Sequence, residues 1–194
     1  MRQYGALIRA EGRRLSAMVE QILGYAKIQN GRARHEPQPL DVDRLIAAAL
    51  AACEAEIRTA GMEVETQIDD DLPPVMADPA SLTHGLRNLI ANAATHAASG
   101  HWMRVRAVRR QSDVEISIAD HGPGLPSAEL AHLFEPFYRG RRAVEEQVRG
   151  FGLGLALAQR IASAHRGSLS VESAQGVGTT FTLRIPLIVE ELDS

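Results

Sequence analysis

The chain begins with a long stretch in which apolar residues recur at steps of three and four. Residues 2–30 contain neither proline nor a cluster of turn residues. This period places apolar side chains on one face of an α-helix, and Gly31 is a typical residue to end one. We therefore predict a single amphipathic helix of roughly eight turns. Its apolar stripe consists of Tyr4, Leu7, Ile8, Leu15, Met18, Val19, Ile22, Tyr25 and Ala26.

The length of this stripe favours a contact with another helix, in a bundle or a dimer. A helix that packs on its own domain is the alternative. The segment 31–39 that follows contains two prolines among polar residues, which is typical of a linker. We expect two parts: residues 1–36, the helix with its linker, and residues 37–194, a second domain.

The second domain mixes helical and strand patterns. Asp78 followed by Pro79 is a typical helix start, because the aspartate caps the helix and proline suits its first position. Two segments that alternate in polarity around a polar turn predict an antiparallel hairpin. The predicted helices cover residues 41–60, 78–100 and 153–164, and the predicted strands cover 64–68, 75–77, 102–108, 114–119, 168–172 and 179–186. The stretch 121–154 is rich in Gly, Pro and Arg and too long for an ordinary connection, so we expect it to be functional or mobile.

Composition limits the classes of function. The 194 residues are 45% hydrophobic, enough for a folded core, while a net charge of -3 argues against binding to nucleic acid. One cysteine, Cys53, excludes an internal disulfide framework and suits the cytoplasm. We find no apolar stretch long enough for a membrane helix and no signal-peptide pattern. Because Lys27 is the single lysine, basic contacts with phosphate should come from arginine.

A pair of amides in the helix over 78–100 is the first candidate for chemistry. Asn88 and Asn92 are four residues apart and share one helix face. Amide oxygens are neutral ligands that could hold Mg²⁺ and the phosphate oxygens it bridges. Taken alone, the pair is more typical of a solvated polar face.

Three glycine motifs follow in the chain. The sequence Asp-His-Gly-Pro-Gly at 120–124 follows a strand, where the carboxylate could accept a hydrogen bond from the amino group of adenine. The sequence Gly-Phe-Gly-Leu-Gly-Leu at 150–155 opens a helix, whose free N–H groups favour phosphate. Its spacing differs from that of dinucleotide-binding folds. The sequence Gly-Val-Gly-Thr-Thr-Phe at 176–181 enters the last strand, and each motif alone is compatible with an ordinary turn.

In this order, and together with the Phe-rich segment 133–140, these motifs resemble the ATP-binding catalytic domain of sensor histidine kinases. That domain belongs to a superfamily that includes gyrase, Hsp90 and MutL. The match runs from about residue 40 to residue 186. The family's boxes correspond to 88–96 (N), 120–124 (G1), 134–137 (F), 150–154 (G2) and 176–181 (G3). The resemblance implies an α+β fold, a two-layer α/β sandwich with helices on one face of a mixed sheet, and ATP and Mg²⁺ as cofactors.

The resemblance also implies roles for individual residues. Asn88 and Asn92 would be the catalytic pair, with Asn92 as the Mg²⁺ ligand and Asn88 as a phosphate or metal partner. Asp120 would recognise adenine through a hydrogen bond. The remaining binding residues would be Gly122, Gly124 and Thr179 at the base, and Gly150, Gly152, Leu153, Gly154, Arg139, Arg142 and His96 near the phosphates. The resemblance also implies a mobile lid over ATP, which would carry Arg139 and Arg142 and which Phe134 and Phe137 would anchor through apolar contacts.

Two departures from the family's pattern matter. Thr95 and His96 stand where members often have lysine and tyrosine, so the lid arginines should matter more, and His96 is equally compatible with a simple helix-end histidine. The long first helix resembles the second helix of the dimerisation and phosphotransfer hairpin, whereas the helix with the phosphate-accepting histidine is absent. His35 lies in the linker and is rejected as acceptor. We therefore expect this chain to bind ATP without phosphorylating itself.

The family resemblance implies partners and leaves alternatives. The partners would be a phosphoacceptor helix of the same family, a response regulator, and a second copy in a homodimeric full-length protein that is often tethered to the inner membrane. An anti-sigma-factor-type serine kinase is one alternative, although its N box usually offers a glutamate where Asn88 stands. A non-catalytic ATP-binding dimerisation module is the other.

Overall fold

The computed structural model describes residues 12, 19, 22, 36–145 and 150–187. The chain divides into two compact units, Met1–Arg34 and His35–Ser194. The helix predicted over residues 2–30 lies outside the described residues except at Gly12, Val19 and Ile22, which are each helical. Its predicted contact with another helix is therefore still a prediction.

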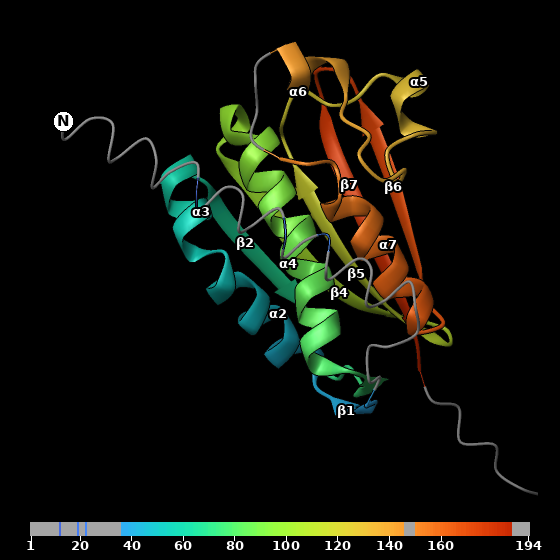
Figure 1. The fold of residues 1–194 in the computed structure, drawn as a ribbon. Coiled ribbons are helices and arrows are strands. Elements are labelled where there is room, and N and C mark those ends of the chain that lie inside the picture. The colour runs from blue at the N-terminus through green and yellow to red at the C-terminus, as the bar shows by residue number, and fades with distance from the viewer. Residues whose placement is uncertain (1–11, 13–18, 20–21, 23–35, 146–149, 188–194) are drawn as a thin grey trace, which may run out of the picture. The chain divides into compact units, whose positions relative to one another are not determined.

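The second unit contains a sheet and the helices that cover it (Figure 1). In chain order its elements are β1 (Gln38–Leu40), α2 (Val42–Ala52), α3 (Glu54–Ala60), β2 (Glu63–Ile68), β3 (Val75–Ala77), α4 (Pro79–His96), the 3₁₀ helix η1 (Ala98–Gly100), β4 (Trp102–Arg110), β5 (Asp113–Asp120), α5 (Ser127–Leu130), α6 (Arg141–Glu145), α7 (Gly154–Ala164), β6 (Ser168–Ala174) and β7 (Gly178–Pro186). Among the described residues, no helix combines the length and the apolar character needed to cross a membrane.

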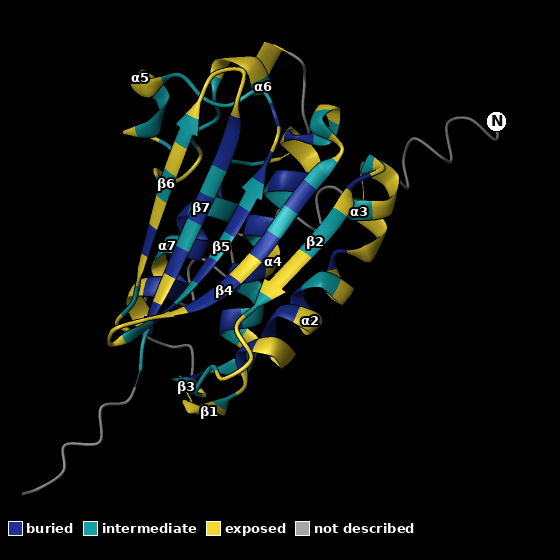
Figure 2. Ribbon diagram, turned by 180° about the vertical axis from the view of Figure 1, so that it is seen from behind, coloured by how far each residue is buried: buried dark blue, intermediate teal, exposed yellow. Residues whose placement is uncertain are grey.

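The main sheet has five strands in the order β2-β4-β5-β7-β6. The β2–β4 pair is parallel, and the other pairs are antiparallel. Helices α2, α4 and α7 lie on one face of this sheet, and Figure 2 shows the opposite face. This mixed sheet with helices on one face confirms the predicted α+β class.

Buried and more exposed residues alternate along the central strands, and the buried ones form the core. Met103, Val105, Ile116 and Ile118 are at most 1% exposed, whereas their neighbours along β4 and β5 are more exposed. From the other layer, α4 buries Leu82, Leu86, Leu89 and Ile90. Burying each of these side chains stabilises the fold by roughly 1.5–3 kcal/mol. The core therefore fixes how α4 lies on the sheet.

The predicted helix over 41–60 is wrong as a single element, because α2 and α3 meet at a break at Cys53. Cys53 has φ -108° and ψ 8°, and its N–H donates to Leu50 O. Its buried thiol donates to the carbonyl of Arg87 on α4 at 3.6 Å. The chain thus leaves helical geometry where a buried side chain meets the neighbouring helix, a tertiary contact that local periodicity does not report.

The predicted linker over 31–39 extends too far, because residues 38–40 form strand β1. This strand pairs antiparallel with β3, and Pro39 lies opposite Met76. A proline is tolerated there because the two-stranded sheet consists of edge strands. The pairing ties the chain that enters this unit to the strand that leads into α4.

The predicted start of α4 is confirmed. Asp78 has an extended backbone conformation, and its carboxylate accepts a hydrogen bond from the N–H of Ser81 at 2.7 Å. Pro79 occupies the first turn. The backbone N–H of Asp78 donates to Nε2 of the buried His165 at 3.1 Å, which connects the start of α4 to the end of α7. A capping side chain of this kind stabilises a helix by about 1 kcal/mol.

Candidate functional site

The two amides lie on the partly exposed face of α4. Asn88 and Asn92 are one turn apart, and both side chains have intermediate exposure. Among the described residues, Asn88 Nδ2 is the buried side-chain atom that has no hydrogen-bond partner. A buried amide donor without an acceptor destabilises a fold by roughly 1–3 kcal/mol. Such an atom is a candidate donor to a ligand or to a water molecule.

The first turn of α7 lies beside this amide. A Cβ added at Gly154 would lie 3.8 Å from Asn88 Oδ1, which is ordinary van der Waals contact. No side chain caps the α7 N-terminus at Leu153. The first N–H groups of a helix lack partners within the helix, and they bind anions. The unpaired amide and an uncapped helix start therefore adjoin each other.

A backbone contact joins the predicted lid to the glycine loop before α7. The N–H of Phe137 donates to the carbonyl of Gly152 at 2.9 Å. Gly152 has φ +70°, and a Cβ there would lie 2.4 Å from Tyr138 O, so only glycine fits. Phe137 itself has φ +66° and a side chain that is 60% exposed. The expected apolar anchoring by the Phe137 side chain is therefore wrong, because its backbone makes the connection.

The predicted lid residues lie between β5 and α7. Arg139 donates to the carbonyl of Ala143 at 2.9 Å, and the exposed Arg142 belongs to α6. The carboxylate of Glu129 on α5 accepts from the N–H of Arg141 at 3.2 Å. These contacts link α5 and α6 to one another.

The end of β5 holds a buried carboxylate. Asp120 is 7% exposed, and its Oδ1 accepts hydrogen bonds from the N–H groups of Gly122 at 2.8 Å and Thr179 at 3.3 Å. Within the described residues, Oδ2 accepts no further bond. Burial raises the pKa of Asp120 above its usual value, while the two N–H donors and His121 act in the opposite direction. One carboxylate oxygen is thus held in place, and the other remains for a ligand.

The glycine loop after Asp120 lies against the end of β6. Gly124 has φ +64°, and a Cβ there would lie 1.9 Å from the carbonyl oxygen of Ala174. The N–H of Gly176 donates to Pro123 O at 2.8 Å. On the other side of the loop, the ring of His121 stacks on Trp102 with 4.0 Å between centroids. The loop is therefore fixed by close packing on both sides.

Sequence reasoning missed Ser173. Its hydroxyl forms hydrogen bonds with Leu125 N at 2.9 Å, Gly178 O at 2.8 Å and Thr179 Oγ1 at 2.9 Å. It thereby joins the segment after Gly124 to the start of β7. The available signal was its place in β6, because a serine follows Leu169 and Val171 at the alternate positions of that strand.

Helix α4 connects the two halves of the candidate site. Asn88 adjoins α7, while a Cβ added at Gly122 would lie 2.7 Å from Cβ of Ala97, just beyond the end of α4. Nine residues of helix span about 14 Å. Figure 1 places the end of α4, the end of β5 and the segments with α5 and α6 at the same end of the sheet. The amide and the buried carboxylate thus lie along the second half of α4, between Asn88 and the end of the helix.

Two further predicted residues lie at the surface. Gly150 is exposed, and a Cβ there would meet nothing within 4 Å. His96 is exposed at the end of α4. The structure therefore brings together Asn88, Gly152, Leu153 and Gly154 in one group, and Asp120, Gly122, Gly124 and Thr179 in another, with Asn92 on the helix between them.

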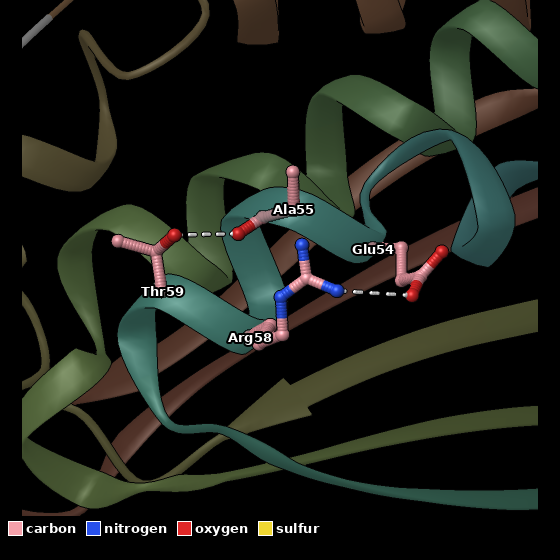
Figure 3. A network of polar contacts seen from close by, with 4 residues as sticks. All are labelled: Glu54, Ala55, Arg58 and Thr59. Carbon is pink, nitrogen blue, oxygen red and sulfur yellow. Dashed lines mark hydrogen bonds and ion pairs between the residues drawn. The ribbon is translucent and has the colours of Figure 1, made fainter.

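A hollow of about 410 Å³ opens elsewhere, between α3 and the end of α4. Alanines of both helices line it together with Glu56, Thr59 and Thr95. On α3, Figure 3 shows the pair of Arg58 and Glu54 at 3.4 Å and the Thr59 hydroxyl, which donates to Ala55 O at 2.7 Å. The charged side chain in this lining, Glu56, would repel phosphate. We therefore assign the candidate site to the motif residues.

Comparison with known proteins gives consistent matches. A family model described as "Histidine kinase-, DNA gyrase B-, and HSP90-like ATPase" matches residues 77–189. The sensor-like histidine kinase SenX3 of Mycobacterium bovis is 30% identical over 98% of this chain, and the match spans 46% of SenX3.

Two solved structures extend this similarity to three dimensions. The crystal structure of full-length ShkA in complex with AMPPNP has a TM-score of 0.83 and 26% identity, covering 95% of this chain and 38% of ShkA. The mycobacterial sensor histidine kinase MprB has a TM-score of 0.64 and 29% identity, covering 78% of this chain and 97% of the MprB chain. The chain therefore corresponds to less than half the length of SenX3 and of ShkA.

Proposed function

Because the chain belongs to the histidine kinase-, DNA gyrase B- and HSP90-like ATPase family, we propose that it is the ATP-binding catalytic portion of a two-component sensor histidine kinase. The observation that carries the proposal is the unpartnered amide of Asn88 beside the uncapped start of α7. The C-terminal end of the same helix lies against the loop after the buried carboxylate of Asp120, so α4 connects donors for phosphate to an acceptor for adenine. The similarity to ShkA, which was solved with AMPPNP, supports a nucleotide ligand.

In this proposal, Asp120 recognises the adenine base. Its Oδ1 is held by two backbone N–H groups, so Oδ2 is oriented to accept a hydrogen bond from the 6-amino group of adenine. Gly122, Gly124 and Thr179 line the base, and the close packing of Gly124 leaves the loop little freedom to move. A site that offers only acceptors at this position rejects a base with a 6-oxo group.

The phosphates lie toward Asn88 and α7. The Nδ2 group of Asn88 and the N–H groups at Gly152, Leu153 and Gly154 donate to phosphate oxygens. Arg139 and Arg142 add positive charge from the lid, in agreement with the near absence of lysine. A place for Gly150 and His96 at the rim of this region is still a prediction, because both residues are exposed.

Magnesium fits the donor set of α4. The oxygens of Asn92 and Asn88 are hard, neutral ligands of the type that Mg²⁺ accepts beside nucleotide phosphates. When bound, Mg²⁺ neutralises negative charge on the phosphates. Asn92 is the proposed ligand because it lies one turn beyond Asn88 on the same partly exposed face.

The proposed reaction moves the γ-phosphoryl group of ATP to a histidine on a helix of the same protein family. A neutral imidazole nitrogen attacks the γ-phosphorus, the bond to the bridging oxygen breaks, and ADP leaves with that oxygen. The imidazole needs no strong base, because its attacking nitrogen already carries a lone pair. Asn88 suits this chemistry, since an amide cannot remove a proton from a serine hydroxyl or a water molecule.

The partners follow from the same proposal. The full-length protein would be a homodimer that works in the cytoplasm and passes the phosphate to an aspartate of a response regulator. The anti-sigma-factor-type serine kinase and the non-catalytic module are not favoured, because the named relatives are sensor histidine kinases.

Nucleotide titration of the chain tests the binding half of the proposal. We expect Asn92→Ala to lose mainly the Mg²⁺-dependent part of ATP affinity, and Asp120→Ala to lose selectivity for adenine. Asp113→Ala is the matched control, because Asp113 lies at the opposite end of β5. Binding curves that are identical for wild type and both site variants would contradict the site.

A transfer assay tests the catalytic half. The chain is mixed with [γ-³²P]ATP and a separately prepared dimerisation hairpin that carries the acceptor histidine. We expect acid-labile phosphohistidine on the hairpin and none on this chain. Acid-stable phosphoserine on a partner would instead support the serine kinase, and label on a histidine of this chain would refute the expected inability to phosphorylate itself.

A further inference from the structure

The hydroxyl of Ser173 in β6 uses its full capacity for hydrogen bonds, with three partners. A serine hydroxyl carries one hydrogen and two lone pairs. Its Oγ accepts from the N–H of Leu125 at 2.9 Å and donates to the carbonyl of Gly178 at 2.8 Å. The third contact, with Thr179 Oγ1 at 2.9 Å, must use the second lone pair.

This count fixes the direction of the Thr179 hydroxyl. The carbonyl of Gly178 can only accept, so the hydrogen of Ser173 is committed to it. Thr179 therefore donates its own hydrogen to Ser173, and its oxygen keeps two lone pairs for any other neighbour. Because Thr179 is 8% exposed, few water molecules can compete for this arrangement.

Thr179 lies directly opposite Asp120 in the β5–β7 register, and its N–H donates to Oδ1 of that carboxylate. The two side chains thus share one face of the sheet as cross-strand neighbours. Both present acceptors there: Asp120 through its free oxygen, and Thr179 through an oxygen whose hydrogen points away.

We propose that Ser173 is a specificity-determining residue, which orients the Thr179 hydroxyl so that the base site recognises only purines with a 6-amino group. This inference rests on the proposed adenine-nucleotide site and names a residue that acts on that site through Thr179. With Ser173 present, a 6-oxo purine meets two acceptors and is rejected. Without it, the Thr179 hydroxyl can rotate and donate to a 6-oxo group, so discrimination weakens.

The test is the ratio of ATP to inosine triphosphate affinity, measured by titration of the whole chain. Inosine triphosphate differs from ATP by a 6-oxo group in place of the 6-amino group. We expect Ser173→Ala to lower this ratio about fivefold or more, the value of one ordinary hydrogen bond. Ser173→Thr keeps the hydroxyl and should restore the ratio. Ser170→Ala is the matched control, since Ser170 is an exposed serine of the same strand.

If Ser173 had a purely structural role, its loss would lower the affinity for ATP and for inosine triphosphate equally. An unchanged ratio of the two affinities in Ser173→Ala would therefore overturn the proposal. If that variant does not fold, the pair Thr179→Val and Thr179→Ser answers the same question. Thr179→Val should lose discrimination between ATP and inosine triphosphate, and Thr179→Ser should keep it. Equal affinity ratios in the two variants would also overturn the proposal. Failure of the wild-type chain to bind ATP would instead count against the proposed function.

Discussion

Replacing Asn88 by leucine should make the protein more stable and unable to bind nucleotide. In the structure, Nδ2 of Asn88 is buried without a hydrogen-bond partner. Leucine has a similar shape and no polar atom, so the substitution removes a penalty of roughly 1–3 kcal/mol. For a unit of this size, 1 kcal/mol raises the midpoint of thermal unfolding by about 2–4 °C. We therefore expect Asn88→Leu to unfold at a midpoint higher by at least 2 °C.

The same substitution removes a phosphate donor. ATP with Mg²⁺ should raise the midpoint of the wild-type chain by mass action, and this increase should vanish in Asn88→Leu. Thermal unfolding of both chains, with and without nucleotide, measures both effects. Asn92→Leu is the control for stability, because the Asn92 amide is not among the buried groups without a partner. A less stable Asn88→Leu chain, or one that ATP still stabilises as in the wild type, would refute this reasoning.

Three further predictions follow from single residues. Gly152→Ala should lower the free energy of unfolding by about 1–3 kcal/mol in denaturant titration, because φ is +70° and the new Cβ would meet Tyr138 O. An unchanged midpoint would show that the loop adapts. Burial raises the pKa of Asp120, so this carboxyl contributes stability at low pH that is lost as pH rises from the ordinary aspartate pKa to the raised one. Asp120→Asn should abolish this part of the pH profile, and ATP affinity of the wild type should rise over the same interval. Cys53 is buried with a pKa raised to about 11, so it should resist a thiol reagent at pH 8 until the chain is unfolded. Rapid labelling of the native chain would contradict its burial.

Elements with strong local signals were predictable. The alternation of β4 and β5 around a polar turn, and the Asp78 cap followed by proline, each specify a structure within a few residues. The break at Cys53 and strand β1 were not predictable, because both depend on partners far along the chain. The Cys53 thiol donates to the backbone carbonyl of Arg87, and β3 pairs with the segment that resembled a linker.

The same distinction between local signals and distant partners applies to the residues of the candidate site. Motif spacing located Asn88 and Asp120, whose neighbours in the fold are glycines that leave a visible pattern. Ser173 left no such pattern, since its role depends on three hydrogen bonds that the fold assembles from separate loops. Phe137 was misjudged because its contact with Gly152 is made by the backbone, which side-chain chemistry does not report.

A crystal structure of the chain with Mg²⁺ and a non-hydrolysable ATP analogue would test the site most directly. We predict the 6-amino group within hydrogen-bond distance of Asp120 Oδ2, and the phosphates at Asn88 and the first turn of α7. A nucleotide bound in the hollow between α3 and α4, or a base with no contact to Asp120, would contradict the assignment.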